Sequence, residues 1–144
     1  MPINKVEFAE LEKKVTGKGK PALDFLAPKV GKAYSVAITR DGCPACEKQK
    51  PKLDKLATAL AQRHGDKVIF TRIHVKYTPE SQEESKRSKR ILGHYFYPTN
   101  MILFRTHDLG AIEYYRNSSP AMSELEKSIE IAIKITVSIG KKKA

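Results

Sequence analysis

The sequence predicts an α/β domain in which a central mixed β-sheet is flanked by helices. Two short runs rich in β-branched and aromatic residues, 34–39 (YSVAIT) and 68–75 (VIFTRIHV), are typical of buried strands. A helical segment of about 18 residues separates them, which is the spacing of a crossover between parallel strands. The chain of 144 residues has room for one such domain and little more.

The first 33 residues are predicted to form an N-terminal extension, made of a helix and a linker, before a domain over residues 34–144. Asn4 and Glu7 have the spacing of a capping box, and a helix is expected over residues 4–15. The apolar residues of this helix recur at helical spacing: Phe8, Leu11 and Val15. A linker rich in helix-breaking residues follows (TGKGKP), and the apolar cluster after it fits a helix or a strand.

The rest of the chain alternates helices and strands. After the first strand, a turn leads into a long helix whose apolar residues lie on one face: Leu53, Leu56, Ala57, Leu60 and Ala61. After the second strand, Thr78 and Pro79 open a polar helix that stops at Gly93. Residues 97–105 and 111–116 are predicted as two further strands joined by a short turn. An apolar stripe predicts the final helix: Met122, Leu125, Ile129, Ala132 and Ile133.

The composition is strongly basic and includes no apolar stretch long enough to span a membrane. Lys and Arg number 27 against 16 Asp and Glu, which gives a formal charge of +11 and an isoelectric point of about 9.7. This charge is found in nucleic-acid-binding proteins, but a solvated lysine-rich surface is the more common reason for it. The N-terminus mixes charges where a secretory signal would be apolar. We therefore expect a cytoplasmic monomer that does not contact membranes.

Cys43 and Cys46 form a C-x-x-C motif (CPAC) where the first strand ends and the long helix begins. The unpaired backbone N–H groups at a helix N-terminus stabilise an anion, so Cys43 is expected to be the thiolate nucleophile. Cys46 lies one turn further into the helix. There we expect it to be less exposed and close enough to resolve a mixed disulfide on Cys43. Pro44 suits the first helical position, which needs no N–H donor.

Two other roles for the cysteines are less favoured. C-x-x-C also supplies zinc ligands, but the chain has no second such pair. No two of the four histidines lie three to five residues apart: His64, His74, His94 and His107. Two inert buried cysteines would leave the position of the motif between strand and helix unexplained. A redox pair is therefore favoured, with no metal and no cofactor.

From Tyr34 to the C-terminus, the chain resembles the thioredoxin-like fold family. Three features match in order: the C-x-x-C motif between strand and helix, Pro51 within that helix, and Tyr97-Pro98-Thr99 before the third strand, where the family has its cis-proline loop. The CPAC sequence itself is similar to the Cys-Pro-x-Cys of glutaredoxins and of some disulfide oxidases.

The resemblance implies a thiol–disulfide oxidoreductase that acts on protein disulfides through Cys43 and Cys46. It also implies that Tyr97, Pro98 and Pro44 bind the substrate, because a cis-proline beside the thiols exposes the preceding backbone to an extended chain. The expected partners are protein disulfide substrates and a redox partner, either a reductase or a small thiol. The direction of electron flow does not follow from the motif, because related proteins differ widely in reduction potential.

Two positions depart from the thioredoxin pattern. Gly42 stands where thioredoxins place an aromatic residue, and Ala37 lies at or near the position of their buried acid. The lysine that partners that acid falls near Arg72. Proton transfer to the resolving thiol must then differ. Asp41 and Glu47 are candidate bases, although a solvated carboxylate is the simpler interpretation of each.

The alternative function is a basic binding module on a thioredoxin scaffold, which contacts nucleic acid or an acidic protein partner. Its candidate surfaces are residues 86–90 and the tail Lys141–Lys143. Lys48, Lys50 and Lys52 add positive charge near the motif, although lysines on a helix usually form only its solvated face. The chain has no Trp and lacks an aromatic-rich RNA-binding signature, which counts against this alternative.

Overall fold

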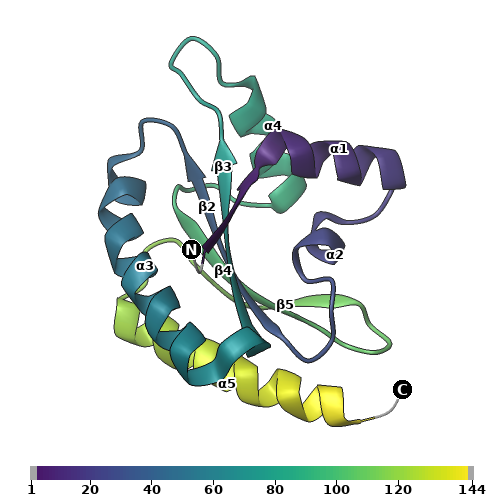
Figure 1. The fold of residues 1–144 in the computed structure, drawn as a ribbon. Helices are drawn as coiled ribbons and strands as arrows, with labels where there is room; N and C mark the ends of the chain where they lie inside the picture. Colours follow the sequence, from purple (N-terminus) through teal and green to yellow (C-terminus); the bar gives the residue numbers. More distant parts are fainter. Residues whose placement is uncertain (1–2, 143–144) are drawn as a thin grey trace.

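The computed structural model describes residues 3–142, which form a five-stranded sheet with helices on both faces (Figure 1). The strands lie in the order β1-β3-β2-β4-β5. The strand bounds are β1 Ile3–Glu7, β2 Ala33–Arg40, β3 Val68–Val75, β4 Thr99–Arg105 and β5 Ala111–Asn117. The helices are α1 Phe8–Lys18, α2 Ala22–Leu26, α3 Pro44–His64, α4 Glu83–Leu92 and α5 Met122–Lys141, with a 3₁₀ turn at Gly65–Lys67.

The sheet is mixed, as the sequence predicts. β3 pairs in parallel with β1 on one side and with β2 on the other. β4 pairs antiparallel with β2, and β5 antiparallel with β4. The long helix α3 is the crossover between the parallel strands β2 and β3. The predicted α/β class is therefore confirmed.

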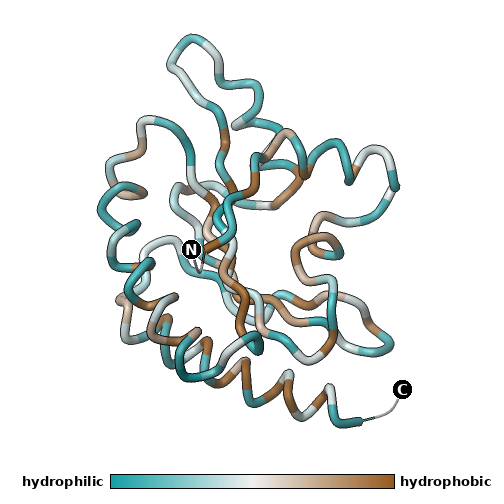
Figure 2. The backbone as a smooth tube through the Cα atoms, in the orientation of Figure 1, coloured by the Kyte–Doolittle hydropathy of each residue, from teal (hydrophilic) through white to brown (hydrophobic). Residues whose placement is uncertain are grey.

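The helices form two layers, with α3 and α5 on one face of the sheet and α1, α2 and α4 on the other (Figure 1). Each face buries an apolar core. The core under α3 and α5 includes Leu60, Phe70, Ile102, Leu125 and Ile129. The opposite core includes Phe8, Ile38, Ile73, Met101 and Leu103. Figure 2 shows hydrophobic residues along the central strands and hydrophilic residues in the peripheral loops.

The N-terminal prediction needs correction. Residues 3–7 form the edge strand β1, not the first turns of a helix, and α1 begins only at Phe8. The reason is the pairing with β3, which extends from Ile3 opposite Phe70 to Glu7 opposite His74. Glu7 precedes α1 but makes no side-chain cap. From residue 3 onwards, the segment predicted as a helical extension therefore supplies an edge strand and two helices to the central sheet.

For two other helices the structure adds to the prediction: it decides the type of one element and moves the start of another. The apolar cluster that fitted either type of element is the short helix α2. The polar helix α4 begins at Glu83, because Thr78 and Ser81 bond to each other across a turn before it. Gly93 ends α4 in the left-handed region (φ +68°), as predicted. Within residues 3–142, no helix combines the length and the apolar character needed to cross a membrane.

Candidate active site

The C-x-x-C motif lies at the N-terminus of α3, directly after a tight turn from β2. Cys43 is the N-cap residue, and it is joined to Cys46 by a disulfide with the two Cα atoms 5.2 Å apart. The backbone N–H of Cys46 donates a hydrogen bond to Sγ of Cys43 (3.2 Å). Gly42, in the turn, has φ +64°, a conformation that glycine adopts without strain. Its lack of a side chain, which departs from the thioredoxin pattern, therefore fits the turn.

The two cysteines are equally buried, which corrects the expectation that Cys46 is the less exposed of the pair. Cys43 is 4% exposed and Cys46 5% exposed. The disulfide explains this, because it draws both sulfurs into the same contact. Pro44, between them, is exposed at the first position of α3. The exposed surface of the motif is therefore formed by Pro44 and Ala45.

The Tyr97-Pro98 peptide bond is cis, as the resemblance implies. β2 and β4 pair with Ile38 opposite Thr99, so the Tyr97-Pro98 loop lies beside the end of β2 that leads to Cys43. Arg40 joins the two segments: its guanidinium donates to the carbonyl oxygen of Asp41 (2.7 Å) and lies 5.6 Å from the centre of the Tyr97 ring. The structure thus brings the predicted substrate loop next to the dithiol turn.

The loop before Pro98 places one histidine inside and two aromatic side chains outside. His94 is buried, its Nε2 lies 2.7 Å from Oγ of Ser88, and burial lowers its pKa to about 4. Tyr95 is 82% exposed and Phe96 67% exposed. Arg116 holds the start of the loop by donating to the carbonyl oxygens of Leu92 (3.1 Å) and Gly93 (2.9 Å). The exposed aromatic pair is therefore fixed next to the cis-proline.

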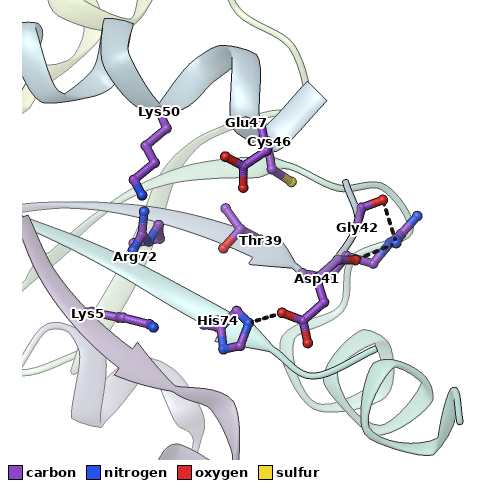
Figure 3. Close-up of a pocket in the computed structure, with 10 residues that line it drawn as sticks. Lys5, Thr39, Asp41, Gly42, Cys46, Glu47, Lys50, Arg72 and His74 are labelled. Carbon is purple, nitrogen blue, oxygen red and sulfur yellow. Dashed lines mark hydrogen bonds and ion pairs between the residues drawn. The ribbon is translucent and has the colours of Figure 1, made fainter. Parts of the chain in front are cut away.

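On the opposite side of the motif, a polar cavity of about 220 Å³ opens beside Cys46 (Figure 3). It is lined by Lys5, Thr39, Arg40, Asp41, Gly42, Cys46, Glu47, Lys50, Arg72 and His74. The strand register explains the set, because Lys5 lies opposite Arg72 and Arg72 lies opposite Ala37 on adjacent strands. Side chains two residues apart on a strand point to the same face. Arg72 and His74 therefore point to the face that α3 covers.

His74 is held between two carboxylates. Its Nδ1 donates to Oε1 of Glu7 (2.8 Å) and its Nε2 donates to Oδ1 of Asp41 (2.7 Å). Carboxylates only accept, so the ring satisfies both contacts only in its cationic form, in which both nitrogens carry a hydrogen. Burial alone would lower the pKa of His74, but the bonds to Glu7 and Asp41 outweigh it and raise this pKa. The bond to His74 is likewise the main cause that lowers the pKa of each carboxyl group.

The candidate residues near the motif therefore separate into two groups. Asp41 is bonded to His74 and to the backbone N–H of Tyr77 (3.2 Å), whereas Glu47 lines the cavity without such a bond. Of the three lysines near the motif, only Lys50 lines the cavity. Ala37 lies directly opposite Arg72, the register that the resemblance indicates. Among residues 3–142, no group of three or more His, Cys, Asp or Glu side chains is arranged to hold a metal ion.

Sequence reasoning missed Lys5, Glu7 and His74. Lys5 and Glu7 were assigned to a helix, and His74 was read only as one of several scattered histidines. One sequence signal points to them. Lys5 and Glu7 are two residues apart, so in a strand they lie on one face, where they pair with Arg72 and His74 of the neighbouring strand.

Solved structures share this architecture, whereas the sequence comparisons found no match. No family model matches the chain, and a comparison with curated proteins found no relative. The Trx4 domain of ERdj5 superimposes with a TM-score of 0.61 at 12% identity, covering 94% of this chain and 98% of that domain. Thioredoxin NaTrxh from Nicotiana alata gives 0.58 at 17% identity, covering 90% and 91%.

A chain in the complex of ferredoxin:thioredoxin reductase with thioredoxin f2 gives a TM-score of 0.55 at 16% identity, covering 91% of this chain and 94% of that one. At these identities the likeness concerns the fold. Together with the strand order, the C-x-x-C motif at the start of α3 and the cis bond before β4, it places this chain in the thioredoxin-like fold.

Proposed function

We propose that the protein is a thiol–disulfide oxidoreductase that acts on protein disulfides through Cys43 and Cys46. The observation that carries the proposal is the disulfide between these two cysteines at the N-terminus of α3, beside a cis-proline loop. The thioredoxins among its structural neighbours support the same chemistry. Two cysteines exchange electrons with a substrate disulfide directly, so the proposal needs no bound cofactor.

In the reduced protein, Cys43 is the nucleophile. The N–H group of Cys46 and the N-terminal end of α3 stabilise a thiolate on Cys43. This thiolate attacks one sulfur of the substrate disulfide, the substrate S–S bond breaks, and the second substrate sulfur leaves as a thiolate. The thiolate of Cys46 then attacks Sγ of Cys43 and displaces the first substrate sulfur. Two electrons pass to the substrate, which becomes a dithiol, and the protein becomes the disulfide.

The substrate chain is proposed to lie along Tyr97 and Pro98 and over the exposed Pro44. The backbone before a cis-proline at the end of a strand is free to pair with an extended chain in the manner of an added strand. The Tyr97-Pro98 loop lies beside the end of β2 that leads to Cys43, so a chain that pairs there lies near the disulfide. Pro44 and Ala45 are the exposed members of the motif, so Pro44 is open to contact with that chain.

A redox partner must return the dithiol to its starting state after each turnover. A reductase or a small thiol is the proposed class of partner. One structural neighbour comes from a complex of ferredoxin:thioredoxin reductase with thioredoxin f2, which supports this class of partner.

The basic-module alternative gains no support from the described surface. In the 86–90 segment, Arg87 pairs with Glu12 (2.6 Å) and Lys86 lies 3.7 Å from Glu83, so part of its charge is already matched. Lys143, at the end of the tail, lies outside the described residues. This alternative stays a prediction from composition.

The test is a pair of single-cysteine variants in an assay of insulin-disulfide reduction. Cys43→Ser should abolish turnover, because the attacking thiol is gone. In Cys46→Ser, Cys43 should still attack the substrate disulfide, and a mixed disulfide between Cys43 and the substrate should accumulate. It is visible as a mass increase that dithiothreitol removes. Comparable residual turnover in both variants would overturn the proposal. Absence of turnover in the wild-type protein, with binding of RNA that weakens steeply as salt rises in the wild type and in both variants, would favour the basic module instead.

A further inference from the structure

The cavity beside Cys46 contains cations that no carboxylate neutralises. Arg72 reaches it from β3 and Lys50 from α3, and Figure 3 shows their charged ends directed toward each other across the cavity. The same two side chains and Cys46 also line a smaller adjoining cavity. Neither Arg72 nor Lys50 forms an ion pair with any carboxylate among residues 3–142. Two like charges therefore face each other beside the resolving cysteine.

Among residues 3–142, the remaining charged groups around Cys46 form no ion pair with these two. They are Lys5 and Glu7 on β1, Arg40 on β2, Asp41 in the turn, His74 on β3, and Glu47 and Asp54 on α3. Glu7 and Asp41 are bonded to the His74 cation, and Lys5 lies 3.5 Å from Glu7. Glu47 is exposed to solvent, which screens its effect. Asp54 is half-buried, but it forms no ion pair with Arg72 or Lys50. Arg72 is half-buried whereas Lys50 is exposed, so the field of Arg72 is screened less than that of Lys50.

The two redox states differ in the charge that they place in this cavity. The disulfide is neutral and leaves Arg72 and Lys50 facing each other. Reduction frees Cys46, whose thiolate adds a negative charge to the same cavity. A nearby cation favours the charged form of an acid, so these side chains stabilise the reduced state more than the oxidised state.

We propose that Arg72, assisted by Lys50, stabilises the thiolate of Cys46 and thereby makes the Cys43–Cys46 disulfide an oxidant of substrate dithiols. This inference rests on the proposed function and adds the direction of electron flow. Arg72 and Lys50 are positioning residues, because they act on the substrate only through Cys46. A stabilised thiolate is also the better leaving group when the disulfide is attacked.

In this direction, the substrate dithiol is oxidised and the protein disulfide is reduced. One thiolate of the substrate dithiol attacks Sγ of Cys43, the Cys43–Cys46 bond breaks, and its electron pair stays on Cys46 as the thiolate beside Arg72. The second substrate thiolate attacks the substrate sulfur of the mixed disulfide and displaces Cys43 as a thiolate. The substrate loses two electrons and becomes a disulfide. The protein gains them and becomes the dithiol, and the substrate's two thiol protons pass to solvent or to the protein thiols.

The experiment compares reduction potentials of full-length variants equilibrated in glutathione buffers, with thiols counted after alkylation. Arg72→Gln should shift the equilibrium constant roughly tenfold toward the protein disulfide, which is a potential about 30 mV more negative. Lys50→Gln should shift it in the same direction by less, because Lys50 is exposed. Arg72→Lys keeps the charge and should restore most of the effect. The matched controls are Lys52→Gln, on the same helix, and Arg90→Gln, both exposed and outside the cavity.

A second readout is the ionisation of Cys46 alone. In a Cys43→Ser background, ultraviolet absorbance of the thiolate should titrate at higher pH when Arg72→Gln is added, and at unchanged pH when Lys52→Gln is added. If Arg72→Gln and Lys50→Gln both match the control variants in potential and in this titration, the inference is overturned while the proposed function stands. If the wild-type protein never forms an internal disulfide in these buffers, both the proposed function and the inference are overturned.

Discussion

His74 and His94 lie on opposite sides of the dithiol, and their surroundings are opposite in kind. β2 leads to Cys43 and lies between β3, which contains His74, and β4, which follows the His94 loop. His74 is a cation between two carboxylates at an open polar cavity. His94 is buried and neutral beneath exposed aromatic side chains. The β3 side therefore places charged groups beside Cys46, whereas the β4 side exposes the aromatic side chains of Tyr95 and Phe96.

The largest expected effect concerns His94 in acid. Its pKa is about 4 in the folded protein against 6.5 ordinarily, so between these values the unfolded chain binds a proton that the folded protein does not. Stability is therefore lost as pH falls from 6.5 toward 4. Between pH 7 and 5, the wild-type protein should lose on the order of 2 kcal/mol more than His94→Gln, which has no ring to titrate. Urea unfolding at the two pH values measures this difference.

The exposed His107 provides the control for this prediction. His107→Gln should lose as much stability on acidification as the wild-type protein does. An equal loss in His94→Gln and the wild-type protein would show that the buried ring does not set the acid sensitivity, and the contrast between the two histidines would fail.

The next effect concerns Tyr95 and Phe96. If the β4 side is the surface that meets a protein substrate, replacing both by Ser should lower kcat/KM for a protein disulfide roughly tenfold, since exposed aromatic anchors contribute most at interfaces. Turnover of a small disulfide, which does not reach the loop, should stay unchanged. Leu109→Ser is the matched control, because Leu109 is equally exposed (74%) but lies in the turn between β4 and β5. Equal losses for both kinds of substrate would place the effect on the thiols instead of on docking.

The smallest effect concerns the His74 ion pairs. The pKa of His74 is raised, so its stabilisation is complete below its unfolded value of about 6.5 and is lost as pH rises through the folded value. The pKa values of Glu7 and Asp41 are lowered, so their contribution is lost only as pH falls through their folded values. His74→Gln should cost less than about 1 kcal/mol at pH 6, because the carboxylates are partly exposed, and still less at pH 9.

Urea unfolding of the wild-type protein and His74→Gln at both pH values, with and without added salt, measures this difference in the free energy of unfolding. Salt should reduce the cost at pH 6, because partly exposed charges are screened. A cost that is the same at pH 6 and pH 9 would mean that His74 stabilises the fold by packing and not by charge.

The two sides of the site also differed in how far the sequence predicted them. The strands β2 and β3 and the helix α3 follow from apolar periodicity, and Tyr97-Pro98 follows from the resemblance, so the dithiol and the loop were predicted. β1 was not predicted from the sequence. Lys5 and Glu7 lie at the polar edge of the site, so this strand lacks the alternation of apolar residues that marks a strand. The cavity beside Cys46 therefore takes part of its lining, Lys5, from a strand that the sequence did not predict.

The contacts that give the cavity its character join residues far apart in the chain. His74 bonds to Glu7, 67 positions away, and to Asp41, 33 positions away. No local pattern encodes such a cluster, since it depends on the strand order β1-β3-β2. Likewise, the left-handed Gly42 and the length of the following helix are local features, but the facing of Lys50 and Arg72 arises only when α3 packs on β3.

The most direct test of the account is a redox titration of the wild-type protein. The protein is equilibrated in glutathione buffers of graded potential and alkylated, and its mass is then measured by mass spectrometry. The account predicts a single transition in which Cys43 and Cys46 change together, with a tenfold change in the ratio of the two forms for every 30 mV or so, as two electrons require. Two independent transitions, each adding one glutathione to one cysteine with no internal disulfide at any potential, would contradict it.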